Sequence, residues 1–136
     1  MISSDLPANE QSRLLQAAWD AVKRAYAPYS NFQVGAAVLT ENGNIFSGCN
    51  IENASYGLTI CAERTAIFSA VAHEGGNSIK IRALVVVNKH NAPCSPCGAC
   101  RQVIFEFGPD AIVIFQGEDG LKEALASELL PKGFHL

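Results

Sequence analysis

The stretch Ile81-Arg82-Ala83-Leu84-Val85-Val86-Val87 decides the fold, because its run of β-branched residues predicts a buried strand. A second apolar run, Ala111-Ile112-Val113-Ile114-Phe115, predicts another. Between the two, we expect a loop over residues 90–96 and then a helix from about Cys97 to just before Gly108. Short links between strand, helix and strand make the two strands parallel. This part of the chain therefore predicts an α/β sheet flanked by helices.

The residues before this unit add a helix and a hairpin. Apolar residues at helical spacing predict a first helix, capped by Asn9 or Ser12 and running to about Tyr26. The apolar runs 32–40 and 45–50 flank an Asn-Gly pair, which is typical of a β-hairpin. The polar segment that follows predicts a loop.

Two further elements complete the expected order. A second helix is predicted from about Cys61 to His73, ending at a Gly-Gly pair. The tail is ambiguous, because residues 121–130 have helical propensity, yet Gly120 could open a short edge strand before a helical turn at 126–130. Since no repeat, low-complexity segment or linker is present, we predict a single domain over residues 1–136.

Composition excludes several classes of protein. Hydrophobic residues make up 49% and charged residues 17%, which excludes intrinsic disorder. The net charge is −3 and no Lys/Arg run exceeds two residues, so we expect no nucleic-acid partner. No apolar run approaches the roughly 20 residues of a membrane span, and no signal peptide is evident. We therefore expect a cytoplasmic protein without a membrane partner, whose five cysteines are reduced.

The cysteines carry the strongest functional signal. Cys61 opens the second predicted helix, and Pro93-Cys94-Ser95-Pro96-Cys97-Gly98-Ala99-Cys100 precedes and opens the third. Three thiolates on one zinc ion leave a position for water, as in a catalytic site, whereas four close the site. Because Pro-Cys-x-x-Cys occurs in two overlapping registers, the spacing does not decide whether Cys94 takes part.

Charged residues beside these cysteines favour a catalytic site. At the first turn of a helix, Cys61 can face the metal while Glu63 faces the metal-bound water and moves its proton. Zinc with three thiolates carries a net charge of −1, and either Arg64 or Arg101 could donate to a sulfur and offset it.

The other cysteine and the histidines give weaker signals. Cys49 is expected to be a small core residue, because free cysteine is often buried. The three histidines have no ligand spacing to the cysteines, so surface or core roles are expected for His73, His90 and His135.

These motifs resemble those of the small zinc-dependent cytidine deaminases of the homotetrameric, three-cysteine type. The resemblance extends over nearly the whole chain, and it implies a three-layer α/β/α sandwich with a mixed five-stranded sheet. It rests on six blocks in this order: APYS (27–30), FQVGAA (32–37), GCNIENA (48–54), CAERTA (61–66), SPCGACRQ (95–102) and ELLP (128–131).

The resemblance also implies a role for each matching residue. It places one zinc ion per chain on Cys61, Cys97 and Cys100, makes Glu63 the proton shuttle, and leaves Cys94 as an extra thiol. Arg64 resembles the arginine that tempers the thiolate charge. The implied substrate contacts are Phe32 on the pyrimidine, Asn50 and Glu52 on the 3′-hydroxyl, the backbone at Ala62 and Ser95 on the ring, and Tyr56 and Phe134 nearby, with Phe134 coming from a neighbouring subunit.

The implied reaction is a step of pyrimidine salvage. Cytidine and 2′-deoxycytidine would be hydrolysed to uridine and 2′-deoxyuridine with release of ammonia, in a homotetramer with shared active sites. Zinc-activated water would attack C4, and Glu63 would deliver protons to N3 and the leaving amine. The alternatives are a sister deaminase of another aminopyrimidine nucleoside such as blasticidin S, a structural four-cysteine zinc module that binds a partner, and a nucleic-acid editing enzyme, which the net charge of −3 disfavours.

Overall fold

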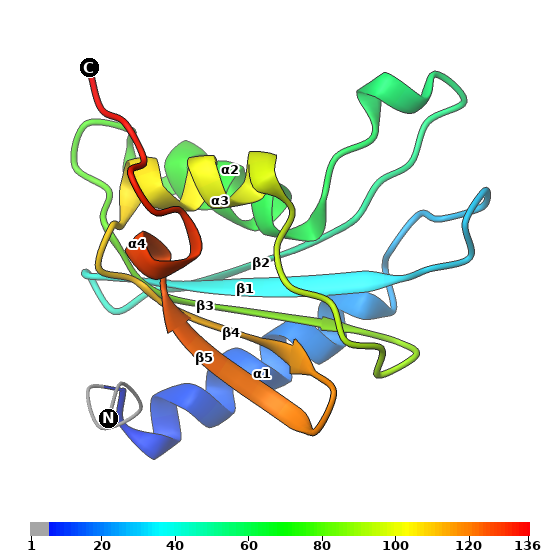
Figure 1. Ribbon diagram of the computed structural model, residues 1–136, viewed down its shortest axis with the longest axis horizontal. Helices are drawn as coiled ribbons and strands as arrows, with labels where there is room; N and C mark the ends of the chain where they lie inside the picture. The colour runs from blue at the N-terminus through cyan, green and yellow to red at the C-terminus, as the bar shows by residue number, and fades with distance from the viewer. Residues whose placement is uncertain (1–5) are drawn as a thin grey trace.

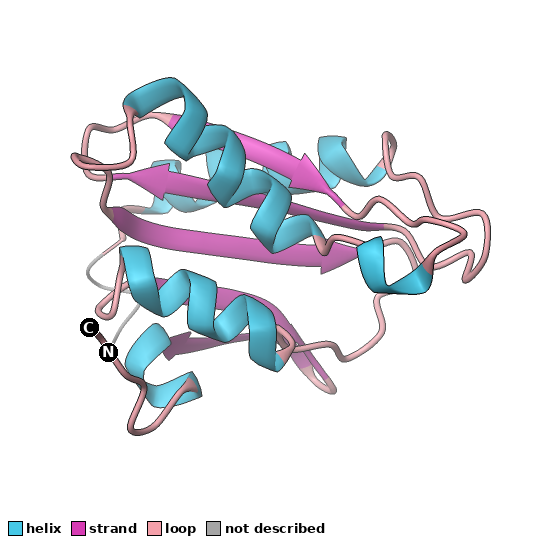
Figure 2. Ribbon diagram, turned by 90° about the horizontal axis from the view of Figure 1, so that it is seen from above, coloured by secondary structure: helices cyan, strands magenta, loops and turns pink. Residues whose placement is uncertain are grey.

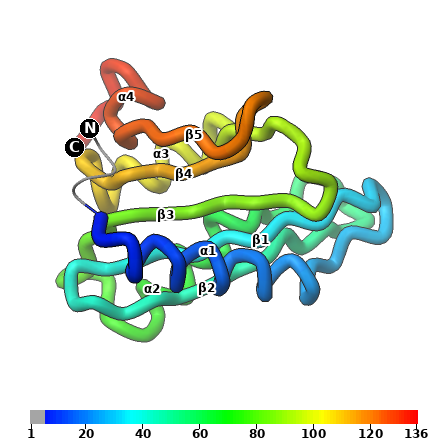
Figure 3. The backbone as a smooth tube through the Cα atoms, turned by 90° about the horizontal axis from the view of Figure 1, so that it is seen from below, coloured from blue at the N-terminus to red at the C-terminus, as the bar shows by residue number. Residues whose placement is uncertain are grey.

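The fold is built around one mixed β-sheet. A computed structural model of the chain describes residues 6–136. The central strand β3 (Ile81–Asn88) runs parallel to β4 (Ile112–Gly117) and antiparallel to β1 (Val34–Thr40). The strands β2 (Ile45–Cys49) and β5 (Gly120–Leu125) form the two antiparallel edges, giving the order β2-β1-β3-β4-β5 (Figure 3). The expected mixed five-stranded sheet is confirmed.

Helices cover both faces of this sheet (Figures 1 and 2). Alternate residues of β3 point to opposite faces, so Leu84 packs in the core beneath α2 (Ala62–Glu74) and α3 (Gly98–Phe107). Val85 packs in a second core beneath α1 (Ala8–Val22). The two cores make three layers, as the resemblance implies.

Two glycines allow the helices to approach the sheet closely. A Cβ on Gly35 of β1 would lie 2.1 Å from the carbonyl oxygen of Ala18 in α1. On the other face, a Cβ on Gly48 of β2 would lie 2.3 Å from the backbone nitrogen of Ala66 in α2. Because neither position has room for a side chain, glycine is needed at both, and Gly48 lets the first half of α2 lie directly against β2.

The predicted first helix is wrong at both ends. It begins at Ala8 directly after Pro7, so neither Asn9 nor Ser12 is its cap. It ends at Val22 rather than near Tyr26, because the N–H of Tyr26 donates to the carbonyl oxygen of Asn50 at 3.0 Å. Pairing with a distant segment therefore overrides the local helical pattern.

The ambiguous tail adopts the strand-and-turn alternative. Strand β5 pairs with β4, and the short helix α4 (Ala126–Leu129) follows it directly. The carboxylate of Glu128 accepts a hydrogen bond from the N–H of Leu125 at 2.8 Å, which fixes the start of this turn.

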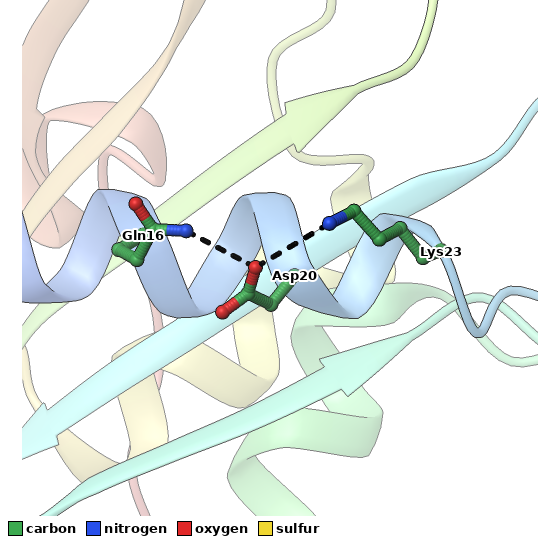
Figure 4. A network of polar contacts seen from close by, with 3 residues as sticks. All are labelled: Gln16, Asp20 and Lys23. Carbon is green, nitrogen blue, oxygen red and sulfur yellow. Dashed lines mark hydrogen bonds and ion pairs between the residues drawn. The ribbon is translucent and has the colours of Figure 1, made fainter.

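The outer surface of α1 carries a small polar network. Asp20 accepts a hydrogen bond from Gln16 at 3.1 Å and lies 3.9 Å from the Lys23 ammonium (Figure 4). Such exposed contacts contribute little to stability, so the buried face of α1 holds the helix in place. Within residues 6–136, no helix is both long enough and apolar enough to cross a membrane.

Candidate metal centre and active site

The starts of α2 and α3 bring three cysteines together. Cys61 immediately precedes α2, Cys97 immediately precedes α3, and Cys100 lies in the first turn of α3. The three sulfur atoms lie within 4.8 Å of one another, with 3.8 Å between those of Cys61 and Cys97. The N–H of Cys100 points at the Cys97 sulfur at 3.5 Å. Helix starts favour thiolates because their N–H groups lack carbonyl partners within the helix.

Two buried polar side chains shape the loop before α3. Asn88, at the end of β3, accepts hydrogen bonds from the N–H groups of His90 and Ala92 at 3.1 and 3.0 Å. Gln116 of β4 accepts from the Asn88 N–H at 2.9 Å through its side chain and from the Cys94 N–H at 2.8 Å through its backbone. Both side chains are more than nine-tenths buried. Neither residue is predicted above as functional, and the polar character of both at the ends of apolar strands is the signal that marks them.

Of the two arginines considered, Arg64 is the one that reaches a sulfur. Its Nη2 lies 3.5 Å from the sulfur of Cys61. Without metal, a hydrogen bond from the Cys100 thiol, aided by Arg64, lowers the pKa of Cys61 to about 5. The Cys100 pKa is raised because its thiol is the donor in that bond. The centre is therefore prepared to carry negative sulfur, which suits a cationic metal.

Arg101 was considered above as a donor to a cysteine sulfur, but its hydrogen bonds go to oxygen atoms instead. Its guanidinium donates to the carbonyl oxygen of Pro96 at 2.7 Å, to the hydroxyl of Ser95 at 2.9 Å and to the carbonyl oxygen of Leu129 at 3.0 Å. These bonds brace the segment that leads into Cys97 against the end of α4.

Glu63 lies in the first turn of α2, only 5% exposed. Burial raises the pKa of its carboxyl to about 7, and the nearby Cys61 thiolate adds to the rise. A group with a pKa near neutrality can both accept and release a proton at physiological pH. Glu63 therefore has the protonation behaviour that a proton shuttle requires.

The predicted substrate residues line one cavity of about 440 Å³ beside the cysteines. This volume falls within the usual range for small-molecule sites. The lining includes Glu63, Cys61 and Cys97 together with five of the predicted contacts: Phe32, Asn50, Glu52, Ala62 and Ser95.

The far end of this cavity is polar. The Asn50 side chain donates to the carbonyl oxygen of Phe32 at 2.8 Å and accepts from the N–H of Val34 at 2.9 Å. Each of its polar atoms keeps one further bonding position. The Glu52 carboxylate accepts from the Ser30 hydroxyl and from the backbone N–H groups of Tyr29 and Ser30. These hydrogen bonds, chiefly that from the Ser30 hydroxyl, lower the pKa of Glu52, so it offers a charged acceptor.

Two predicted contacts lie outside this cavity. Tyr56, in the single turn η2 (Tyr56–Leu58), is 74% exposed and lines an adjoining hollow with Tyr29. Phe134 is 65% exposed in the C-terminal tail and does not line the cavity of its own chain. A contact from Phe134 would therefore have to reach the substrate of a neighbouring subunit.

The remaining two cysteines do not join the metal group. Cys94 lines the cavity, but its sulfur is not a member of the three-sulfur cluster, so the closed four-cysteine arrangement is not formed. Cys49 is half-buried rather than a fully enclosed core residue. All five cysteines fall within the described residues, and each is a free thiol.

These observations define a class of protein. Three clustered thiols, two of them at helix starts, fit the sulfur-rich coordination that zinc prefers and would supply three of its four ligands. A buried carboxyl group lines the cavity beside them. The class is an α/β protein with a three-cysteine group that could hold zinc beside a cavity with a buried carboxyl group.

Comparison with known proteins identifies the family. Residues 8–116 match the cytidine and deoxycytidylate deaminase zinc-binding region. A cytidine deaminase from Sporosarcina psychrophila is 48% identical over 124 residues, covering 90% of this chain and 89% of that protein. The crystal structure of a cytidine deaminase from Burkholderia pseudomallei has a TM-score of 0.80 and 47% identity, covering 90% of this chain and 98% of that one. One from Mycobacterium tuberculosis has a TM-score of 0.80 and 38% identity, covering 93% and 98%. The chain belongs to the zinc-binding cytidine deaminase family.

Proposed function

We propose that this chain is a cytidine deaminase, which hydrolyses cytidine and 2′-deoxycytidine to uridine and 2′-deoxyuridine and releases ammonia. The observation that carries the proposal is that Glu63, with a pKa of about 7, lines the same cavity as Cys61 and Cys97 of the three-cysteine cluster. The names of the curated relatives point to the same activity.

In this proposal, Cys61, Cys97 and Cys100 hold the zinc ion. When bound there, zinc supplies an acidified water as the nucleophile at neutral pH. Glu63 takes a proton from the attacking water and delivers it to N3 of the ring. It then takes the remaining proton from the hydroxyl formed at C4 and delivers it to the amino group, which leaves as ammonia while C4 becomes a carbonyl. Arg64 offsets the negative charge of the sulfurs, and its 3.5 Å contact with Cys61 supports this role.

The cavity walls suggest how the nucleoside is oriented. Phe32 packs on the pyrimidine ring, while the backbone at Ala62 and Ser95 meets its O2 and amino group. Asn50 and Glu52, at the polar end of the cavity, hold the 3′-hydroxyl. Because this grip does not involve the 2′ position, the deoxynucleoside is accepted as well.

The exposed aromatic residues support a homotetramer with shared active sites. The segment that carries η2 projects beyond the sheet (Figure 1), and it exposes Tyr56 and Leu58, which is 64% exposed. Apolar side chains on a projecting arm favour burial against another copy of the chain. Phe134 of a neighbouring subunit would then complete the cavity, and Tyr56 would approach the substrate. We further propose a single domain over residues 1–136 that acts in pyrimidine salvage in the cytoplasm.

The test is to incubate the zinc-loaded protein with cytidine and 2′-deoxycytidine at neutral pH. Ultraviolet absorbance follows loss of the cytosine ring, and released ammonia is measured in parallel. We expect one ammonia for each uridine formed. Turnover of blasticidin S but neither cytosine nucleoside would replace the proposal with the sister activity, and no turnover of any of them would overturn deamination of these substrates.

A further inference from the structure

We propose that His90 is a positioning residue for the substrate, because its ring holds Phe32 in place as a wall of the cavity. The inference rests on the proposed function, in which Phe32 packs on the pyrimidine. The His90 and Phe32 rings are stacked, with 5.7 Å between their centroids and 17° between their planes. Phe32 lines the cavity and His90 does not, so His90 would act on the substrate only through Phe32.

A second contact joins His90 to the same segment. Its Nε2 lies 3.0 Å from the carbonyl oxygen of Asn31. Because a carbonyl oxygen only accepts hydrogen bonds, Nε2 carries the proton and donates. Asn31 has a φ of 57°, in the left-handed region, which Asn adopts more readily than most residues with a side chain. The bond from His90 thus secures the backbone at this turn, one residue before Phe32.

The backbone of His90 is itself fixed by the core. Its N–H donates to the side chain of Asn88, which is 1% exposed and anchored at the end of β3. The loop that begins there continues to Ser95 and Cys97, which also line the cavity. His90 therefore links the segment that carries Phe32 to the loop that leads to the metal ligands.

This arrangement predicts a specific kinetic effect. Packing of Phe32 against the pyrimidine is the same in the ground state and in the transition state, so loosening Phe32 removes uniform binding, which raises KM and leaves kcat unchanged. Aromatic stacks contribute modestly, so His90→Ala should raise KM for cytidine about 3- to 10-fold. We expect kcat to change less than about twofold, and the zinc content to stay at the wild-type level.

Two conservative variants separate the stack from the hydrogen bond. His90→Phe keeps an aromatic ring against Phe32 and loses the donor, and we expect it to restore KM to within about twofold of wild type. His90→Gln keeps a donor and loses the ring, and we expect its KM to resemble that of His90→Ala. If KM in His90→Ala equals that of wild type, or if its kcat falls as much as KM rises, the inference is overturned.

The chain offers a matched control in His73. Its ring lies against that of Phe46, with 5.2 Å between centroids, and its Nδ1 lies 2.8 Å from the carbonyl oxygen of Ser69. Neither His73 nor Phe46 lines the cavity. His73→Ala removes an equivalent pair of contacts and should leave KM unchanged. An equal rise of KM in this variant would show a general loss of packing and overturn the role of His90.

A second readout keeps the inference independent of the reaction. In protein labelled with ¹³C on phenylalanine rings, we expect the Phe32 signals to shift or broaden in His90→Ala and to stay sharp in His90→Phe. Unchanged Phe32 signals in His90→Ala would overturn the inference whatever the enzyme turns over. If wild type fails to deaminate cytidine while these signals change, the proposed function fails but the positioning of Phe32 stands.

Discussion

The two ends of α2 carry the same residue type in opposite environments. Glu63, in the first turn, is 5% exposed, and burial raises the pKa of its carboxyl to about 7. Glu74, in the last turn, accepts hydrogen bonds from Asn44, Thr40 and Asn42 at 2.8, 2.8 and 2.9 Å. Those bonds, chiefly that from Asn44, lower its pKa. One carboxyl is thus prepared to exchange protons, and the other holds the β1–β2 hairpin in place.

This contrast shows where the fold provides stability and where it provides reactivity. At Glu74 a charge receives donors and solvent, which is the arrangement that stabilises a folded chain. At Glu63 the fold withholds solvent from a carboxyl group, at a cost in stability. Such a cost is typical of a functional group rather than a structural one.

The largest effect is expected from removing a sulfur beside the Glu63 end of the helix. Cys100 is fully buried among the three clustered thiols, so Cys100→Ala should lose bound zinc and reduce turnover below detection. Zinc content is measured by atomic absorption, and turnover by ammonia release. Cys94→Ala is the matched control, and it should keep one zinc per chain and turnover within about twofold of wild type. Loss of zinc in Cys94→Ala would instead favour a four-cysteine site.

The next effect concerns the stability of the zinc-free protein. Because the folded-state pKa of Glu63 is about 7 against an ordinary 4.5, the folded chain keeps its proton more tightly than the unfolded chain between these values. Stability from this group is therefore full below pH 4.5 and is lost as the pH rises through 7. Glutamine does not ionise, so Glu63→Gln avoids this loss of stability. At pH 8 the substitution should raise the free energy of unfolding by about 3 kcal/mol. Urea unfolding in the presence of a chelator measures this, and a difference that does not shrink towards pH 4.5 would contradict it.

The opposite pH dependence is expected at Glu74. Its pKa is lowered on folding, so its stabilising effect is present above the unfolded value and is lost as the pH falls through the folded value. Glu74→Gln should slightly lower the midpoint of thermal unfolding at pH 7, with a smaller difference in acid. Turnover should stay within about twofold of wild type, because Glu74 does not line the substrate cavity. A variant as stable as wild type at pH 7 would show that the hairpin does not need this carboxylate.

The sequence predicts the metal-binding cysteines and the buried carboxyl group better than it predicts the buried polar residues that hold the loop beside them. Cys61 and Glu63 lie two residues apart at a helix start, so local geometry was sufficient to place them together. The partnership of Asn88 with Gln116 joins residues on two strands, and no local pattern reveals it. The end of α1 was mispredicted for the same reason, because Tyr26 is paired with a distant segment.

The central claim is that the two glutamates of α2 differ in function because they differ in environment. The most direct test is to measure cytidine turnover and zinc content for wild type, Glu63→Gln and Glu74→Gln side by side. We predict that Glu63→Gln keeps its zinc and loses turnover by at least about 10²- to 10⁴-fold, whereas Glu74→Gln keeps both. Full turnover in a zinc-loaded Glu63→Gln, or an equal loss in Glu74→Gln, would contradict the account.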